Sequence, residues 1–181
     1  MTFSHRLATD ADLPVIAALM DRAITRLQAD FLSPEQVAAS RASMGLDTQL
    51  IADRTYWLVL ARVEGNDRLA GCGGWSRRAT LYGGDHATAL RDPALLDPAR
   101  DPARIRAMYT DPDFVRRGVG RLVLALCEDA ARAAGFRGAR MMATLAGEPL
   151  YRACGYTPVE RVDRMAASGI AVPGTVMEKA L

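Results

Sequence analysis

A turn rich in arginine and glycine, residues 115 to 121, has the composition expected of a phosphate-binding loop. It precedes a segment with apolar residues at helical spacing, so its backbone N–H groups are expected at a helix start. The first N–H groups of a helix lack intrahelical partners and lie at the positive end of its dipole, which favours a bound anion. Two glycines leave the backbone accessible, and three arginines supply guanidinium groups suited to phosphate oxygens. The candidate contacts are Val115, Arg116, Arg117, Gly118, Val119, Gly120 and Arg121.

The other common phosphate-binding loops do not occur in the sequence. It contains no G-x-x-x-x-G-K-S/T, and no complete G-x-G-x-x-G follows a predicted strand. A nucleoside-triphosphate loop and a dinucleotide-binding fold are therefore not indicated. From these residues alone, an ordinary turn without a ligand is the alternative to a phosphate site.

The segments on either side of the turn predict the order strand, turn, helix. Residues 105 to 110 alternate apolar and polar side chains as a strand does, and Pro112 ends the strand because proline cannot donate to a sheet. After the turn, apolar residues recur at helical spacing from Val119 to Ala133, and Gly135 ends the predicted helix. One face of this helix is therefore expected to pack, while the other faces water.

The stretch over residues 108 to 156 resembles the cofactor-binding half of the GNAT superfamily of acetyl-CoA-dependent N-acetyltransferases. The turn fits the Gln/Arg-x-x-Gly-x-Gly/Ala pattern of that family except at the first position, where Val115 replaces the usual Gln or Arg. The resemblance continues through a predicted strand over residues 139 to 144. It extends to residues 148 to 156, which are similar to the family's aromatic-Tyr-x-x-x-Gly-aromatic helix and strand start. With a weaker N-terminal match, it covers nearly the whole chain except residues 77 to 103.

The resemblance implies one α/β (α+β) domain over residues 1 to 181, with a mixed, mostly antiparallel GNAT-like sheet flanked by helices. It implies acetyl-CoA as cosubstrate, with the pyrophosphate on the turn. A backbone N–H near Tyr109 and Thr110 would polarise the acetyl carbonyl as an oxyanion-type donor. Met108, Tyr109 and Thr110 therefore join the turn residues as predicted cofactor contacts. No metal is expected, because His5 and His86 show no ligand spacing with the cysteines.

The implied reaction is attack of an amine on the acetyl thioester, and the departing thiolate needs a proton donor. Tyr151 matches the family's tyrosine for that role, and its reference pKa near 10, above the ~8.5 of a thiol, lets it donate and then recover a proton. A half-buried aromatic that only packs is the alternative for Tyr151. No base is identified: His86 or the adjacent Asp85 is one candidate, because histidine titrates near neutrality, and a water chain is the other.

Residues 1 to 76 predict the elements that support this site. We expect first a strand over residues 3 to 7, then a helix over residues 13 to 27 and a second helix ending at Met44. A hairpin over residues 55 to 75 follows. In the family pattern the two helices form one wall of the acceptor groove, although their apolar stripes are also explained as core. Asp47 is a candidate cap for a further short turn.

Residues 77 to 103 are irregular and contain three Asp-Pro pairs. A connection this long inside a compact domain is usually functional or disordered. Because it joins two strands that border the acetyl-transfer cleft in the family pattern, we predict a substrate-side lid, with a plain surface insertion as the alternative. The resemblance implies that residues 104 to 181 form the acetyl-CoA-binding half. Two strands are predicted at its end, over residues 157 to 162 and 172 to 179, and Pro173 is expected to break the second one early.

The composition is that of one compact domain: 181 residues, 50% hydrophobic, suffice for a sizeable core. The net charge of +2, with basic and acidic residues mixed, indicates neither a nucleic acid nor a membrane partner. Cys72, Cys127 and Cys154 form no C-x-x-C pair, which favours a reducing compartment and core positions. Without a signal pattern or a long apolar run, the chain is expected in the cytoplasm.

These observations together predict an acetyl-CoA-dependent N-acetyltransferase whose acceptor is the amine of a small molecule. Acetylation of a protein N-terminus or lysine is the alternative within catalysis, and it would need an open groove. A non-catalytic acyl-CoA-binding regulator is the alternative from another class, disfavoured by Tyr151. A homodimer is left open as the assembly.

Overall fold

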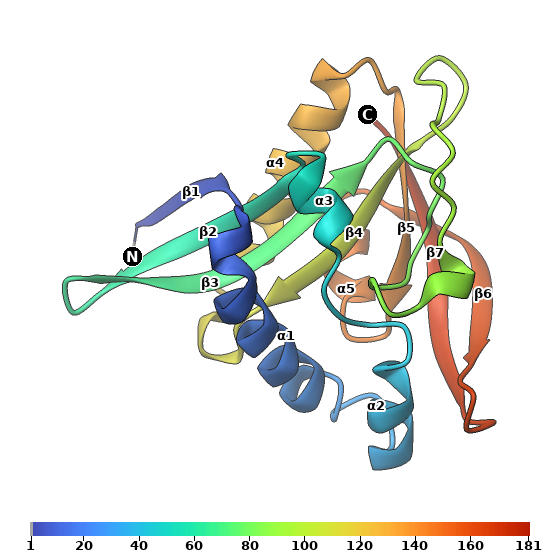
Figure 1. The fold of residues 1–181 in the computed structure, drawn as a ribbon, viewed down its shortest axis with the longest axis horizontal. Helices are drawn as coiled ribbons and strands as arrows, with labels where there is room; N and C mark the ends of the chain where they lie inside the picture. The colour runs from blue at the N-terminus through green and yellow to red at the C-terminus, as the bar shows by residue number, and fades with distance from the viewer. Residues whose placement is uncertain (1) are drawn as a thin grey trace.

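Seven β-strands join into one sheet in the computed structural model, which describes residues 2 to 181, with the order β1-β2-β3-β4-β5-β7-β6 (Figure 1). The strands are β1 (Phe3–Leu7), β2 (Tyr56–Val63), β3 (Asn66–Ser76), β4 (Ala103–Thr110), β5 (Gly138–Thr144), β6 (Thr157–Met165) and β7 (Ala171–Ala180). All neighbouring strands are antiparallel except β4 and β5, which are parallel. The predicted mixed, mostly antiparallel sheet is therefore confirmed.

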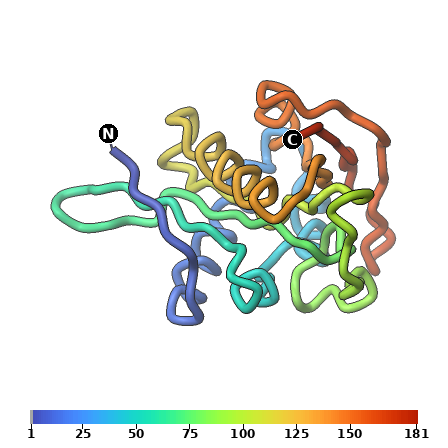
Figure 2. Tube along the Cα trace, turned by 90° about the horizontal axis from the view of Figure 1, so that it is seen from above, coloured from blue at the N-terminus to red at the C-terminus, as the bar shows by residue number. Residues whose placement is uncertain are grey.

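Helices cover both faces of this sheet, as Figure 2 shows for the blue α1 and the yellow-orange α4. The helices are α1 (Leu13–Leu27), α2 (Pro34–Ser40), α3 (Thr48–Ala52), α4 (Val119–Ala133) and α5 (Glu148–Ala153). The alternation of side chains along β2 shows why two core layers form: Val59 and Ala61 are buried with residues of α4, whereas Tyr56 and Leu58 are buried with residues of α1. Each helix thus buries its apolar stripe against one face of the sheet.

The parallel contact between β4 and β5 is short, and this opens the sheet. Only Ala103 with Ala139 and Arg104 with Arg140 are paired, although both strands continue for several residues beyond these pairs. Past them the strands separate. The sheet is therefore interrupted in its middle at the end where β4 leads into the arginine-rich turn.

The structure corrects two predicted boundaries. The second helix, α2, ends at Ser40 rather than Met44, since the chain continues in turns. The predicted early break of the last strand at Pro173 is wrong, because β7 runs through this residue opposite Asp163 of β6. Pairing of β7 with β5 begins only at Gly174. Pro173 therefore lies where β7 has no β5 neighbour, and no hydrogen bond to β5 is lost through its missing N–H group.

Residues 77 to 102, the predicted segment without Ala103 of β4, fold back on themselves and contain one short helical element, the 3-10 turn η2 (Thr88–Leu90). The Thr80 hydroxyl donates to the Asp92 carbonyl at 2.9 Å and accepts from the Asp92 N–H at 2.8 Å. Arg78 and Leu95 form an isolated bridge close by. The segment is thus tied at its base, and its role as a lid stays a prediction.

Asp111 fastens the end of β4 just before the arginine-rich turn. Its side chain is fully buried and forms an ion pair with Arg22 of α1 and another, at 3.3 Å, with Arg68 of β3. It also accepts from the backbone N–H of Asp113 at 2.9 Å, which starts the 3-10 turn η3 (Pro112–Phe114). One carboxylate therefore holds three parts of the chain in a fixed relation to the turn.

We expect Asp111→Asn to lower the free energy of unfolding by about 1–3 kcal/mol, because a buried charged acceptor is lost while the exposed ends of its arginine partners can be rehydrated. Urea unfolding measures the change. Asp113→Asn is the matched control: its carboxylate is half exposed and should matter much less. Equal losses in the two variants would contradict the role of Asp111.

Candidate active site

A cavity of about 760 Å³ occupies the opening between β4 and β5. It is bordered by the arginine-rich turn, by α5, by the C-terminal end of α1 and by residues 81 to 84 of the folded-back segment. Most of the residues predicted as cofactor contacts line it, together with the predicted acid. They are Met108, Tyr109, Thr110, Val115, Arg116, Gly118, Val119, Gly120, Arg121 and Tyr151.

The turn before α4 contains two residues in the left-handed backbone conformation. Arg116 and Gly118 both have positive φ values, +61° and +85°, and α4 begins directly afterwards. Among residues 2 to 181, no side chain caps the first N–H groups of α4. A Cβ at Gly118 would meet nothing within 4 Å, so glycine is required there by the conformation rather than by space. Successive N–H groups in such a turn form a concave donor surface at the positive end of the helix.

Gly120 is expected from the sequence to leave the backbone accessible to a phosphate, but the structure shows a packing reason for this glycine. A Cβ on it would lie 2.7 Å from Leu150 Cδ2, so the glycine allows α5 to pack closely against the start of α4. Arg117 lies outside the cavity lining, with its guanidinium 5.7 Å from the centre of the Phe114 ring. Arg116 and Arg121 are the two turn arginines that line the cavity.

A β-bulge in β4 lies on the same cavity. Cys72 of β3 pairs with Tyr109 and Gly74 pairs with Arg106, so two residues of β4 oppose one residue of β3. Ala107, in the bulge, has a φ of +51°, and its carbonyl accepts from the Tyr56 hydroxyl at 2.9 Å. Bulges re-aim backbone groups. The backbone groups of β4 in the bulge are therefore not all used in regular hydrogen bonding to β3 where the strand borders the cavity.

The hairpin glycines of β3 make room for this bulge. A Cβ at Gly73 would collide with the Met108 sulfur and lie 2.8 Å from Val123 Cγ1 of α4. Glycine is thus needed because Met108 and the helix both approach the strand backbone closely.

Tyr151 is buried beside the cavity and 8% exposed. Burial raises the pKa of its hydroxyl above the ordinary value, so the group stays protonated at neutral pH. The Tyr156 ring packs edge-on against it at 6.1 Å. Within residues 2 to 181 no hydrogen bond engages the Tyr151 hydroxyl, so it is available to a ligand in the cavity.

Glu148 sets the position of α5 and thereby of Tyr151. Its buried carboxylate accepts from the Thr175 hydroxyl of β7 at 2.8 Å and from Arg161 of β6 at 2.9 Å. Arg152, one turn along α5, adds a third partner at 2.8 Å. Burial alone would raise the pKa of Glu148, but these hydrogen bonds and charges lower it. The side chain is therefore a structural anchor between the helix and two strands.

The two residues proposed as a base are not among the residues that line the cavity, although His86 lies beside Gly45 and Gly84, which do. A ring nitrogen of His86 lies 2.8 Å from the Arg41 carbonyl oxygen, and the Asp85 carboxylate accepts the Thr48 N–H at 3.1 Å. Asp85 thus caps α3, a role predicted for Asp47. Asp47 instead lies on the cavity, 2.7 Å from Arg106 and 2.9 Å from Arg91.

Sequence reasoning did not identify several polar side chains of the cavity. Arg106 of β4, Gln28 at the end of α1 and Arg164 of β6 all line it. Arg106 stands in an alternating strand, and alternation does not distinguish a residue that faces water from one that faces a cavity. No signal for the other two is present in the sequence, since their elements meet only in the folded chain.

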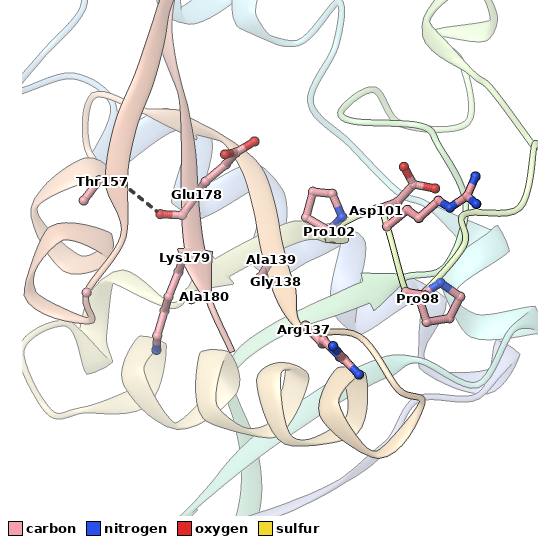
Figure 3. A pocket seen from close by; sticks show the side chains of 13 residues that line it. Pro98, Asp101, Pro102, Arg137, Gly138, Ala139, Thr157, Glu178, Lys179 and Ala180 are labelled. Atoms are coloured by element: carbon pink, nitrogen blue, oxygen red, sulfur yellow. Dashed lines mark hydrogen bonds between the residues drawn. The ribbon is translucent and has the colours of Figure 1, made fainter.

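A second cavity, of about 540 Å³, lies at the other end of β5 and β7 (Figure 3). Two of its charged side chains have partners: Lys179 points toward α4 and pairs with Glu128 at 2.7 Å, and Glu178 pairs with Arg140 at 3.0 Å. None of the predicted site residues lines it. The larger cavity is therefore the candidate active site.

Residues 2 to 181 contain no group of three or more His, Cys, Asp or Glu side chains arranged to hold a metal ion. No helix in the same range combines the length and apolar character needed to cross a membrane.

Comparison with known proteins finds a match to the family model described as the acetyltransferase (GNAT) family over residues 20–156. No match is found among curated proteins. A GCN5-related N-acetyltransferase from Rhodopseudomonas palustris is similar in structure, with a TM-score of 0.69, 22% identity and coverage of 100% of this chain and 97% of the other.

Two further structures share this fold at lower identity. The PaiA N-acetyltransferase from Thermoplasma acidophilum in complex with coenzyme A has a TM-score of 0.63 and 12% identity, covering 100% of both chains. The ribosomal-protein-S18-alanine N-acetyltransferase from Escherichia coli has a TM-score of 0.58 and 16% identity, covering 99% of this chain and 94% of the other.

We expect Gly118→Ala to lower CoA affinity about tenfold, equivalent to ~1.4 kcal/mol, because a side chain disfavours the left-handed conformation that aims the turn's N–H groups. Calorimetric titration with CoA measures this. Gly65→Ala is a matched control, since Gly65 has a φ of +80° in the β2–β3 turn and equally open surroundings. Both variants should lose similar stability. Unchanged CoA affinity in Gly118→Ala would contradict the turn as a phosphate site.

Proposed function

The chain belongs to the GNAT family of acetyltransferases, and we propose that it transfers the acetyl group of acetyl-CoA to the primary amine of a small molecule. One observation carries this proposal. The arginine-rich turn at the start of α4, the β4 bulge and Tyr151 all border one cavity between two separated strands. In this proposal one cavity therefore contains a site for an anion, backbone groups that are not used in regular strand pairing, and a protonated hydroxyl.

In this proposal the turn holds the CoA pyrophosphate. The N–H groups at the start of α4 supply the donors, and Arg116 and Arg121 supply the charge. The remainder of the cosubstrate lies between β4 and β5, where its amide groups can meet strand backbone. Backbone N–H groups of the bulge, next to Met108 and Tyr109, polarise the acetyl carbonyl.

Tyr151 acts as the general acid in the proposed reaction. The amine attacks the carbonyl carbon, the bond to sulfur breaks, and the phenol donates its proton to the departing thiolate. Because burial raises the pKa of Tyr151, the hydroxyl is fully protonated before the reaction and recovers its proton from solvent afterwards. The absence of a competing hydrogen bond within residues 2 to 181 supports this role.

Water is favoured as the carrier of the amine proton. His86 and Asp85, the side-chain candidates, are engaged with Arg41 and Thr48 and do not line the cavity. A base in that position would need to act from outside the cavity, whereas a chain of water molecules can reach the amine directly.

Side chains on the acceptor side of the cavity favour a small acceptor over a protein. Tyr82 and Gly84 of the folded-back segment, the end of α1 near Gln28, and Arg164 of β6 surround the side away from the turn. A polypeptide acceptor would need an open groove there. Acetylation of a protein is the second candidate, because one similar structure is that of a ribosomal-protein-alanine acetyltransferase.

We expect Tyr151→Phe to lower kcat by roughly 10²- to 10⁴-fold while CoA affinity changes little, because the ring and its packing stay and only the proton is removed. Single-turnover rates with a confirmed amine acceptor are the measurement, since slow product release would mask a chemical effect. In the wild type, no alkaline loss of kcat from ionisation of Tyr151 should occur up to about pH 10.

Tyr156→Phe is the matched control for this experiment. It removes the same hydroxyl from the neighbouring ring, and Tyr156 does not line the cavity. Its single-turnover rate should stay close to that of the wild type. An equally active Tyr151→Phe protein would make Tyr151 a packing residue and require another proton donor.

A further inference from the structure

Arg164 of β6 is a cation on the cavity that lacks a carboxylate partner among residues 2 to 181. One terminal nitrogen donates to the Ser43 hydroxyl at 3.2 Å, and the guanidinium lies 5.8 Å from the centre of the Tyr82 ring. Its Nε is buried without a hydrogen-bond partner. Burial lowers the pKa of Arg164, because the protein replaces water around the charge without an acid to compensate.

Arg106, which lies on the same cavity and is more deeply buried than Arg164, is different in this respect. Arg106 has a side chain 4% exposed, but Asp47 lies 2.7 Å away and the Gly83 carbonyl accepts from it at 2.6 Å. Asp47 also pairs with Arg91 at 2.9 Å. A charge that is partly removed from water without a counter-ion is unfavourable, and the contacts of Arg164 with Ser43 and Tyr82 supply no negative charge.

The location of Arg164 assigns it to the acceptor side of the cavity. It comes from β6 and contacts Ser43 and Tyr82, whereas the phosphate-binding turn leads into α4. Burial and the nearby Tyr151 raise the pKa of the Tyr109 hydroxyl and Arg164 lowers it, so both side chains lie close to this residue beside the bulge. The guanidinium is therefore within reach of a small molecule whose amine is at the transfer point.

Gln28 adds a second polar group without a partner at this end. Its amide nitrogen donates to the Met44 sulfur at 3.4 Å, while its buried Oε1 accepts no hydrogen bond. Met44 follows Ser43, the partner of Arg164, so one loop links the two side chains. The cavity thus offers a positively charged donor and a neutral acceptor, which suit an anionic group and an N–H group of one ligand.

We propose that Arg164 binds a carboxylate of the acceptor, so that the substrate is a small amine that also carries a carboxylate, as amino acids do. The single uncompensated charge matches a monoanion better than a phosphate dianion. This inference rests on the proposed function, because the bound molecule is taken to be the acetyl acceptor. The binding of the carboxylate can nevertheless be measured separately from acetyl transfer. Arg164 is here a specificity-determining residue, and it takes no part in the proton transfers.

The test compares each of a panel of L-amino acids with its own amide, which keeps the amine and removes the negative charge. The wild type should use the acid with a kcat/KM about 10- to 100-fold above that of the amide, as expected for a charge-assisted hydrogen bond. Arg164→Gln should abolish the difference, and Arg164→Lys should retain part of it. Arg62→Gln, which removes an exposed arginine of β2 paired with Asp67, should leave the preference intact.

A binding measurement separates this inference from the proposed function. The probes are N-acetyl amino acids and their amides, titrated by calorimetry into the CoA-loaded wild type and the CoA-loaded Arg164 variants. If no amine is acetylated but the acids bind better than the amides through Arg164, the inference holds and the proposed function fails. If amines are acetylated without any preference for the acid, or with one that Arg164→Gln leaves unchanged, the inference is overturned.

Discussion

The separation of β4 from β5 is the constraint on which the rest of the structure depends. Two residue pairs join these strands, and beyond Arg104 and Arg140 their facing backbone edges no longer bond to each other. Buried backbone polar groups need partners, so an interrupted sheet is stable only if water or a ligand enters the gap. The cavity of about 760 Å³ at this point provides that access. A cosubstrate with amide groups and a phosphate end fits such an opening, because strand edges and a helix start are both available.

Several local interactions keep the gap open in a defined shape. Asp111 anchors the end of β4, Glu148 joins α5 to the two C-terminal strands, and Gly120 lets α5 approach the start of α4. Each acts on backbone placement rather than on a ligand. The turn and Tyr151 are thereby held beside the same cavity. Catalytic geometry of this kind depends on rigid supports, since small displacements weaken oriented hydrogen bonds.

The sequence predicted the strand, turn and helix around the cavity because each has a local signal. Period-two alternation, glycine at left-handed positions and helical spacing are all properties of neighbouring residues. It did not predict the bulge at Ala107 or the cavity position of Arg164, because these arise from pairing between distant segments. Asp85 illustrates the same limit: it caps a helix that starts at Thr48, well before it in the chain. Long-range polar contacts carry no signature in one sequence.

The most direct test of this account is a crystal structure of the protein with CoA. The account predicts the pyrophosphate against the N–H groups of residues 116 to 121, with the thiol end between β4 and β5 near Tyr151. Electron density for CoA in the cavity at the other end of β5, or a CoA phosphate away from the start of α4, would contradict it.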